Sequence, residues 1–323
     1  MKTRIAGTGH FLPKTVVTND DLSRIMDTSD EWISSRTGIR ERRLATEETT
    51  ATMSAEAAKL ALEDAGMKAE DIDVIIVATV SPDHITPSTA CEVQAIIGAD
   101  KAVAFDINAA CSGFLFALRT ADVYIKQGIY KNALIIGAET LSKVMDWNDR
   151  STCVLFGDGA GAAVICPSEE ESRGLVSVTL GSNGAGGSVL SGINRLNNNP
   201  CVKNETGPHY IHMDGQEVYK FAVTTVPASI EKVLSEAGLT INDIKYFVLH
   251  QANLRIIQSV SKRLKADIEK FPVSLDHCGN ISAASVPVLL DEMNRKGMLE
   301  KGDRLVLAGF GGGLTWGACV LEW

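Results

Sequence analysis

Three residues of this sequence have polar side chains of types that could take part in a chemical reaction. They are Cys111 in "DINAACSGF", His250 in "VLHQANLR" and Asn280 in "HCGNISAAS". A thiolate is a strong nucleophile, an imidazole donates hydrogen bonds or carries protons near neutral pH, and an amide nitrogen donates to developing negative charge. Together these residue types suit acyl transfer through a covalent intermediate.

Cys111 is the candidate nucleophile. The small neighbours Ala109, Ala110 and Gly113 leave room for an acyl group. Apolar residues then recur at helical spacing, at Phe114, Leu115, Leu118 and Ala121. The pattern predicts a helix that begins beside the thiol, where free backbone N–H groups favour a thiolate. The alternative is an inert buried cysteine, because free cysteine packs as a small hydrophobe.

The other two candidates also have plain structural interpretations. His250 ends an apolar run, as a polar residue leaving the core would. Asn280 stands in a Gly-Asn pair that suits a turn or a helix cap. The segment "GFGGGLTWGA" (309–318) follows a strand pattern, and its glycines allow backbone N–H groups to converge on one oxygen, as in an oxyanion hole.

The elements that would position these residues occur twice. "LEDAGMKAEDIDVIIVA" (62–78) is matched by "LSEAGLTINDIKYFVLH" (234–250), and "KNALIIGAE" (131–139) by "DRLVLAGFG" (303–311). "VAFDINAACSG" (103–113) and "FPVSLDHCGNISAAS" (271–285) both read as strand, small-residue turn and helix start. Strands at 74–80, 133–138, 246–250 and 304–309 are apolar on both faces, which predicts sheets covered by helices. The order favours a duplicated α/β fold, with residues 167–216 forming loops at the junction.

Composition excludes several classes of protein. The chain has 323 residues and a formal charge of −9, which argues against wholesale nucleic-acid binding. Its seven cysteines are scattered, so neither a disulfide framework nor a Cys-x-x-Cys metal site is expected. No segment reads as a secretory signal or a membrane span, and "FGDGAGAAV" (156–164) lacks the pattern of a nucleotide-binding loop. We therefore expect a cytoplasmic protein.

The motifs jointly resemble the β-ketoacyl-acyl-carrier-protein synthase III family. The resemblance rests on "AACSGF", "HQANLRI", "GNISAAS" and the terminal "GFGGGLTWGA", and extends back to "TSDEWISSRTGIRERR" (28–43). It implies a thiolase-like fold of duplicated α/β halves, layered helix-sheet-helix-sheet-helix. We expect residues 1–170 to form the half that carries Cys111, and residues 171–323 the half that carries His250 and Asn280.

The resemblance also implies a mechanism. Cys111 would take the acyl group from a short acyl-CoA, and malonyl-acyl-carrier-protein would then lose CO2 and condense with it. His250 and Asn280 would donate to the enolate oxygen, and the backbone N–H groups of Cys111 and Gly312 would form the oxyanion hole. No metal or cofactor is expected, with coenzyme A entering as the substrate's thioester. A homodimer is expected.

Binding residues are implied in the same way. The expected CoA contacts are Thr28, Trp32, Arg36, Arg150 and Asn253, with Trp32 and Arg150 sandwiching the adenine. The acyl pocket is expected at Thr86, Leu141 and Phe156, with Thr86 reaching across the dimer interface. Carrier-protein docking is expected at Lys220, Gln251, Ala252, Asn253, Leu254, Arg255, Lys262 and Arg263, because a carrier protein is acidic and needs a local basic face. Surface helices and solvated charges are the plain alternatives.

Two other functions stay open on the sequence. One is a synthase-III-like condensing enzyme of secondary metabolism. The other is a non-catalytic acyl-CoA-binding protein with a vestigial site, which acylation of Cys111 would exclude.

Overall fold

The computed structural model describes residues 2–170, 173–192, 197, 199–202 and 210–323. Its first sheet is built from β1 (Thr3–Phe11), β4 (Val74–Ala78), β5 (Val103–Ile107), β6 (Ala133–Thr140) and β7 (Asp158–Pro167). The strand order is β1-β7-β6-β4-β5. β4 runs parallel to β5 and β6, and β7 runs antiparallel to β1 and β6.

The second sheet repeats this plan with one strand fewer. It is built from β8 (Gly174–Ser182), β11 (Tyr246–Leu249), β12 (Arg304–Gly311) and β13 (Thr315–Glu322), in the order β11-β12-β13-β8. β11 and β12 are parallel, and β13 is antiparallel to both of its neighbours. β4, β6 and the interior of β12 are buried throughout, as the apolar patterns predict for strands covered on both faces.

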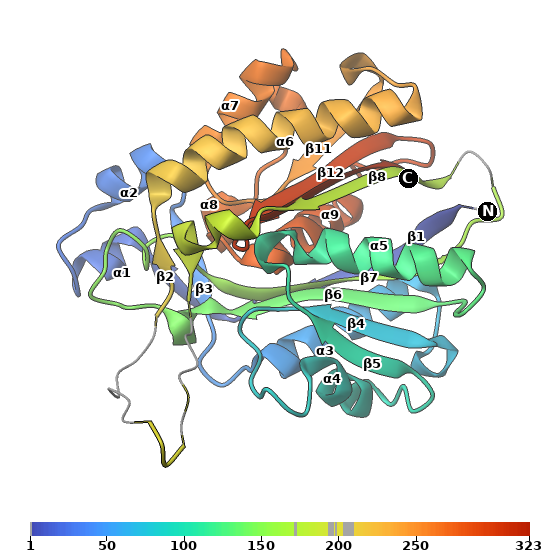
Figure 1. Cartoon of the computed structure of the whole chain (residues 1–323), viewed down its shortest axis with the longest axis horizontal. Coiled ribbons are helices and arrows are strands. Elements are labelled where there is room, and N and C mark those ends of the chain that lie inside the picture. The colour runs from blue at the N-terminus through green and yellow to red at the C-terminus, as the bar shows by residue number, and fades with distance from the viewer. Residues whose placement is uncertain (1, 171–172, 193–196, 198, 203–209) are drawn as a thin grey trace.

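Helices form three layers around these sheets (Figure 1). α3 (Thr50–Ala65) and α4 (Thr89–Ile97) cover the outer face of the first sheet, and α6 (Gly215–Ala237) and α7 (Leu254–Leu264) cover the second. α5 (Gly113–Lys126) and α9 (Ser285–Arg295) lie between the sheets and contact both. The result is the expected helix-sheet-helix-sheet-helix layering.

The central helix α5 forms because its apolar residues recur on one face. Phe114, Leu115, Leu118 and Ala121 are all buried, as the spacing predicts. Their burial fixes the start of α5, and therefore the turn that precedes it, against both sheets.

The remaining elements lie at the end of the molecule that holds the candidate residues. They are α1 (Asn19–Ser23), α2 (Asp30–Thr37), α8 (Leu275–Cys278), the pair β2 (Thr15–Thr18) and β3 (Glu41–Leu44), and the short pair β9 (Leu190–Ser191) and β10 (His212–Met213). No helix among the described residues has the length and apolar character needed to cross a bilayer.

The two halves follow the same path at one sequence offset. β4 begins at Val74 and β11 at Tyr246, 172 residues later, and α5 and α9 are separated by the same interval. Ala110 and Ser282 are also 172 residues apart, and each holds a positive φ (45° and 47°) that non-glycine residues rarely adopt. These parallels support our proposal that the chain divides by duplication into residues 1–170 and 171–323.

Two sequence predictions about this fold are wrong. The expected strand in "FPVSL" does not form: Pro272 lacks an N–H, and the N–H of Ser274 donates to the Gln251 side chain at 3.0 Å in place of a sheet neighbour. Residues 167–216 are not all loops, because the nine-residue β8 lies among them and pairs with β13. The Asn-rich part of that segment falls largely outside the described residues.

Candidate active site

Cys111 lies in a short 3₁₀ turn (Ala110–Ser112) between β5 and α5. Its residue is 9% exposed. The positive φ of Ala110 bends the chain sharply just before it. Gly311 at the end of β12 lies against the cysteine, since a Cβ built there would be 2.8 Å from both the Cβ and the backbone nitrogen of Cys111. Only a glycine at position 311 therefore lets Cys111 occupy its position.

The protonation of Cys111 differs from the sequence prediction. Burial raises the pKa of its thiol to about 12, Glu139 adds to the rise, and the Ser282 hydroxyl opposes it. α5 begins only at Gly113, so desolvation outweighs the favourable helix start. Cys111 is therefore a thiol at neutral pH, and any reaction at its sulfur would have to remove the proton.

His250 directly follows β11 and is buried. Its Nδ1 lies 2.7 Å from the Ser285 hydroxyl, and its ring packs edge-on against Phe310 with centroids 5.2 Å apart. Burial lowers the pKa of the imidazole to about 3. The ring is therefore neutral at physiological pH, with one nitrogen able to donate and the other able to accept.

Asn280 lies in the loop between α8 and α9. Its backbone forms a bridge to the segment around Phe156: its N–H donates to Leu155 at 2.8 Å, and its carbonyl accepts from Gly157 at 3.0 Å. Its side-chain Oδ1 accepts from the Ser282 N–H at 2.9 Å. Because the amide oxygen is engaged, the group left for a ligand is the donor Nδ2.

Two cavities meet at Cys111. One, of about 240 Å³, is lined by Cys111, His250 and Asn280 and reaches Trp32 and Arg36. The other, of about 550 Å³, is lined by Cys111, Leu141 and Phe156. The structure thus brings the three candidate catalytic residues, which come from both halves, onto one connected space. Cys111, His250 and Asn280 therefore line a cavity together, whereas the plain alternative was that each packs separately in the core.

Most of the residues expected to contact CoA lie at the outer end of the smaller cavity. Trp32, Arg36 and Asn253 line it. The guanidinium carbons of Arg36 and Arg150 lie 4.8 and 5.3 Å from the centre of the Trp32 ring system. Arg150 also pairs with Asp27 at 2.9 Å and does not line the cavity. An adenine between Trp32 and Arg150 would need a separation of about 7 Å, so Arg150 must move outward.

The other expected residues differ in their positions. Thr28 has a buried hydroxyl with no hydrogen-bond partner among the described residues. Thr86 is exposed in the 81–87 loop and lines neither cavity of its own chain. Gly312 lines the larger cavity beside Cys111, as an oxyanion-hole residue would.

The expected docking residues are mostly exposed. We call Arg255, Lys262 and Arg263 the α7 basic face; all three are exposed. Lys220 is exposed on the neighbouring α6 and pairs with Glu217, while Ala252, Asn253 and Leu254 are half-buried. Gln251 is a correction: it is fully buried, and its amide group bonds the Leu249 carbonyl and the Ser274 N–H. It cannot touch a partner protein.

Sequence reasoning missed the buried polar residues that lie next to Cys111, His250 and Asn280. Ser282 and Ser285 contact Asn280 and His250, and Glu139 accepts from Ser81 Oγ at 2.5 Å and from the Val80 N–H at 3.1 Å. The repeat carried a signal for Ser282, since it matches Ala110, the neighbour of Cys111. The larger cavity is also lined by Leu190 and Ile211, from a loop-rich segment with no distinguishing pattern.

This fold and this site define a thiolase-like condensing enzyme, an acyltransferase. The family models "3-Oxoacyl-[acyl-carrier-protein (ACP)] synthase III" and its C-terminal part match residues 105–184 and 234–323. The chain belongs to the β-ketoacyl-acyl-carrier-protein synthase III family.

The similarity to individual members covers almost the whole chain. The β-ketoacyl-[acyl-carrier-protein] synthase III of Clostridium acetobutylicum is 52% identical over 321 residues, 99% of this chain and 98% of that protein. The crystal structure of the Aquifex aeolicus enzyme is 46% identical with a TM-score of 0.93, covering 99% of this chain and 100% of the other. The priming β-ketosynthase of the R1128 polyketide pathway is 36% identical with a TM-score of 0.93, covering 99% and 96%.

Proposed function

We propose that this protein condenses a short acyl-CoA with malonyl-acyl-carrier-protein and so initiates fatty-acid synthesis. The product is a 3-oxoacyl-carrier-protein. One observation carries the proposal: Cys111 lies where two cavities meet, with His250 and Asn280 on the wall of the cavity that opens toward Trp32. Each substrate can thus reach the thiol by the same route.

The first step transfers the acyl group. Cys111 Sγ attacks the thioester carbonyl, a new C–S bond forms, and the C–S bond to CoA breaks. The thiol proton passes to the departing CoA sulfur as the bond to CoA breaks, so CoA leaves as a free thiol. The backbone N–H groups of Cys111 and Gly312 stabilise the oxyanion of this step. Since the resting thiol is protonated, proton transfer belongs to the attack itself.

The second step forms the carbon–carbon bond. Malonyl-carrier protein loses CO2, and the electron pair of the broken bond becomes an enolate. His250 Nε2 and Asn280 Nδ2 donate hydrogen bonds to the thioester oxygen where this charge develops. The enolate carbon attacks the acyl carbonyl, and the bond to Cys111 breaks to return the thiol after protonation. Decarboxylation removes no proton from carbon, so two donors suffice in place of a base.

The substrate sites follow from the cavities. Trp32, Arg36, Arg150, Thr28 and Asn253 hold the CoA, with its adenine between Trp32 and the displaced Arg150. Leu141 and Phe156 line the acyl pocket. The α7 basic face, with Lys220, Ala252, Asn253 and Leu254, receives the acidic carrier protein. The chemistry of both steps needs no cofactor or metal, because the thioester supplies all the activation.

Thr86 enters the site only in a homodimer. β5 lies at the edge of its sheet, and its first residue, Val103, is 48% exposed. Ile85, next to Thr86, is 68% exposed. An unprotected apolar edge beside an exposed loop favours pairing with a second copy, which would bring Thr86 to the partner's acyl pocket. The seven free cysteines suit the reducing cytoplasm, where we place the enzyme.

Intact-protein mass spectrometry tests the proposal. Acetyl-CoA should add one acetyl group, and subsequent malonyl-carrier protein should remove it as the 3-oxoacyl product. Cys111→Ala should take up none, while Cys319→Ala, a matched change at another buried cysteine, should behave as wild type. Normal activity in Cys111→Ala would overturn the assignment, as would failure of acetyl-CoA and of larger and branched acyl-CoA primers to acylate the protein.

The same assay separates the remaining alternative. An enzyme of secondary metabolism would discharge its acyl group only to a different carrier protein. Strict use of the fatty-acid carrier with short acyl-CoA primers supports the proposal.

A further inference from the structure

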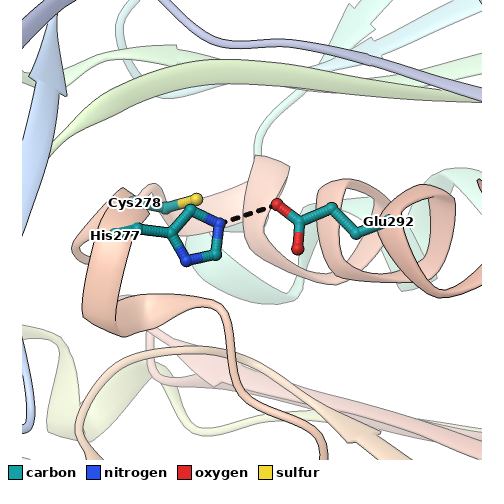
Figure 2. A group of neighbouring side chains, drawn as sticks. All are labelled: His277, Cys278 and Glu292. Atoms are coloured by element: carbon teal, nitrogen blue, oxygen red, sulfur yellow. Dashed lines mark hydrogen bonds and ion pairs between the residues drawn. The ribbon is translucent and has the colours of Figure 1, made fainter. Parts of the chain in front are cut away.

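A second group of reactive side chains lies outside both cavities. His277 and Cys278 come from α8, and Glu292 comes from α9 (Figure 2). One ligand-type atom from each, a nitrogen, a sulfur and an oxygen, lies within 4.8 Å of the other two. Cys278 and Glu292 are buried, and only the His277 side chain is partly exposed. The condensation mechanism uses none of these residues.

The contacts around the group orient its ligand atoms. His277 Nε2 lies 2.8 Å from Glu292 Oε1, while its Nδ1 lies 3.0 Å from the Asp276 carboxylate. The second carboxylate oxygen of Glu292 is held by Lys296 at 3.1 Å. A histidine whose far nitrogen bonds a carboxylate is the usual arrangement behind a metal-binding imidazole. Oε1 and Nε2 are thus turned toward Cys278 and toward each other.

We propose that His277, Cys278 and Glu292 bind a Zn²⁺ ion. Thiolate, imidazole and carboxylate are its preferred ligands, whereas Mg²⁺ and Ca²⁺ require oxygen ligands. A water molecule takes the fourth tetrahedral position, and the exposed edge of His277 provides the entry path.

Binding requires only a small rearrangement. Without the ion, a protonated His277 ring forms an ion pair with the Glu292 carboxylate. Zn²⁺ replaces that proton and the thiol proton of Cys278, both of which pass to solvent. The Nε2–Oε1 separation opens from 2.8 Å to about 3.3 Å, the spacing of neighbouring ligands around a tetrahedral zinc.

The position of the ion gives it a structural effect. His277 and Cys278 precede the loop that carries Asn280, and Glu292 follows it in α9. A metal that joins these ligands ties α8 to α9 across the ends of that loop. The bound form is therefore more stable to heat, and the ion does not touch the reacting atoms.

The test is a Zn²⁺ titration against a competing chelator in the full-length Cys111→Ala/Cys201→Ala protein. This background removes the active-site thiol and the exposed cysteine, which could bind zinc themselves. We expect one tight equivalent of Zn²⁺, a higher melting temperature when it is bound, and a thiolate-to-metal absorption band when Co²⁺ is used instead. Adding Cys278→Ala should abolish the band and weaken binding by about 100-fold or more. Adding Cys319→Ala, the matched control, should change neither.

A variant outside the ligand set keeps the proposal falsifiable if Cys278→Ala does not fold. Asp276→Asn retains all three ligands but weakens the support of His277, so it should reduce Zn²⁺ affinity by about 10- to 100-fold. Two results would show that these residues form only an ion pair. In the first, the Cys111→Ala/Cys201→Ala protein binds no tight equivalent of Zn²⁺. In the second, Asp276→Asn binds Zn²⁺ with unchanged affinity. A Co²⁺ band that survives in folded Cys278→Ala would likewise overturn the assignment.

Discussion

The hydroxyl of Ser285 lies 2.7 Å from Nδ1 of His250, and this contact controls which ring nitrogen carries the proton. Ser285 Oγ accepts from the Gln251 N–H at 3.3 Å and has one proton to give, either to Nδ1 or to the Ser282 carbonyl at 2.9 Å. Donation to Nδ1 leaves the ring proton on Nε2, where the proposed enolate donor is needed. Ser285 is therefore a positioning residue for His250.

Ser285→Ala should slow condensation about tenfold, because His250 loses the partner that fixes its tautomer. The loss is smaller than the ~10²–10³ typical of deleting an oxyanion donor outright. Acylation of Cys111 by acetyl-CoA should stay near the wild-type rate in single-turnover mass spectrometry. Equal slowing of both steps would instead indicate a general disturbance of the site.

Gly311→Ala should block acylation. The new methyl group would lie 2.8 Å from Cys111 Cβ and 3.1 Å from its Sγ, which forces the nucleophile out of position. Gly184→Ala is the matched control, since a Cβ there meets nothing within 4 Å. The measurement is the rate of acetyl transfer together with the melting temperature. A folded Gly311→Ala enzyme with unchanged acylation would contradict the close approach.

The alkylation of Cys111 should depend steeply on pH. Because burial raises the thiol pKa to about 12 and lowers the His250 pKa to about 3, the resting enzyme holds a neutral thiol and a neutral imidazole. The rate of iodoacetamide labelling, followed at the Cys111 peptide, should rise about tenfold per pH unit between pH 6 and 9. A plateau from neutral pH upward would reveal a preformed thiolate–imidazolium pair.

Arg255→Glu and Lys262→Glu should raise KM for malonyl-carrier protein and leave the KM for acyl-CoA unchanged, because they reverse charges on the α7 basic face. Added salt should likewise raise the wild-type KM for malonyl-carrier protein and leave the KM for acyl-CoA unchanged. Lys232→Glu makes the same charge change about 18 Å beyond Lys220 along α6 and should have no effect. Equal changes in both KM values would place docking elsewhere.

Glu139→Gln should alter how stability depends on pH. Burial raises the pKa of Glu139 to about 7 from 4.5, so the folded protein binds more protons than the unfolded chain between these values. Stability contributed by this group therefore falls as pH rises from 4.5 to 7, by on the order of 3 kcal/mol. Denaturant unfolding at pH 5 and pH 8 should show a smaller difference in Glu139→Gln. An identical difference in both proteins would count against a protonated buried carboxyl.

The reactive residues were predictable to different degrees. Cys111, His250 and Asn280 could be found because each follows a run that predicts a buried strand, although the run before Asn280 forms no strand. Ser285 and Glu139 could not, because a serine or a glutamate in a buried segment looks the same whether it supports a catalytic residue or only packs. The roles of Trp32 and Arg150 came from family resemblance, since a half-buried aromatic and an exposed arginine have many plain explanations.

The sequence by itself determined the fold class and the kind of chemistry. Hydrophobic periodicity reports which faces are buried, and the repeat reports two similar halves; both are local properties of the chain. Only the tertiary structure decided that Cys111 and Asn280 share a cavity and that Cys111 is a thiol at neutral pH. It also decided that the buried Gln251 side chain, and not a neighbouring strand, accepts the Ser274 N–H. These facts depend on distance and desolvation between segments far apart in the chain, and such quantities exist only once the segments are packed together.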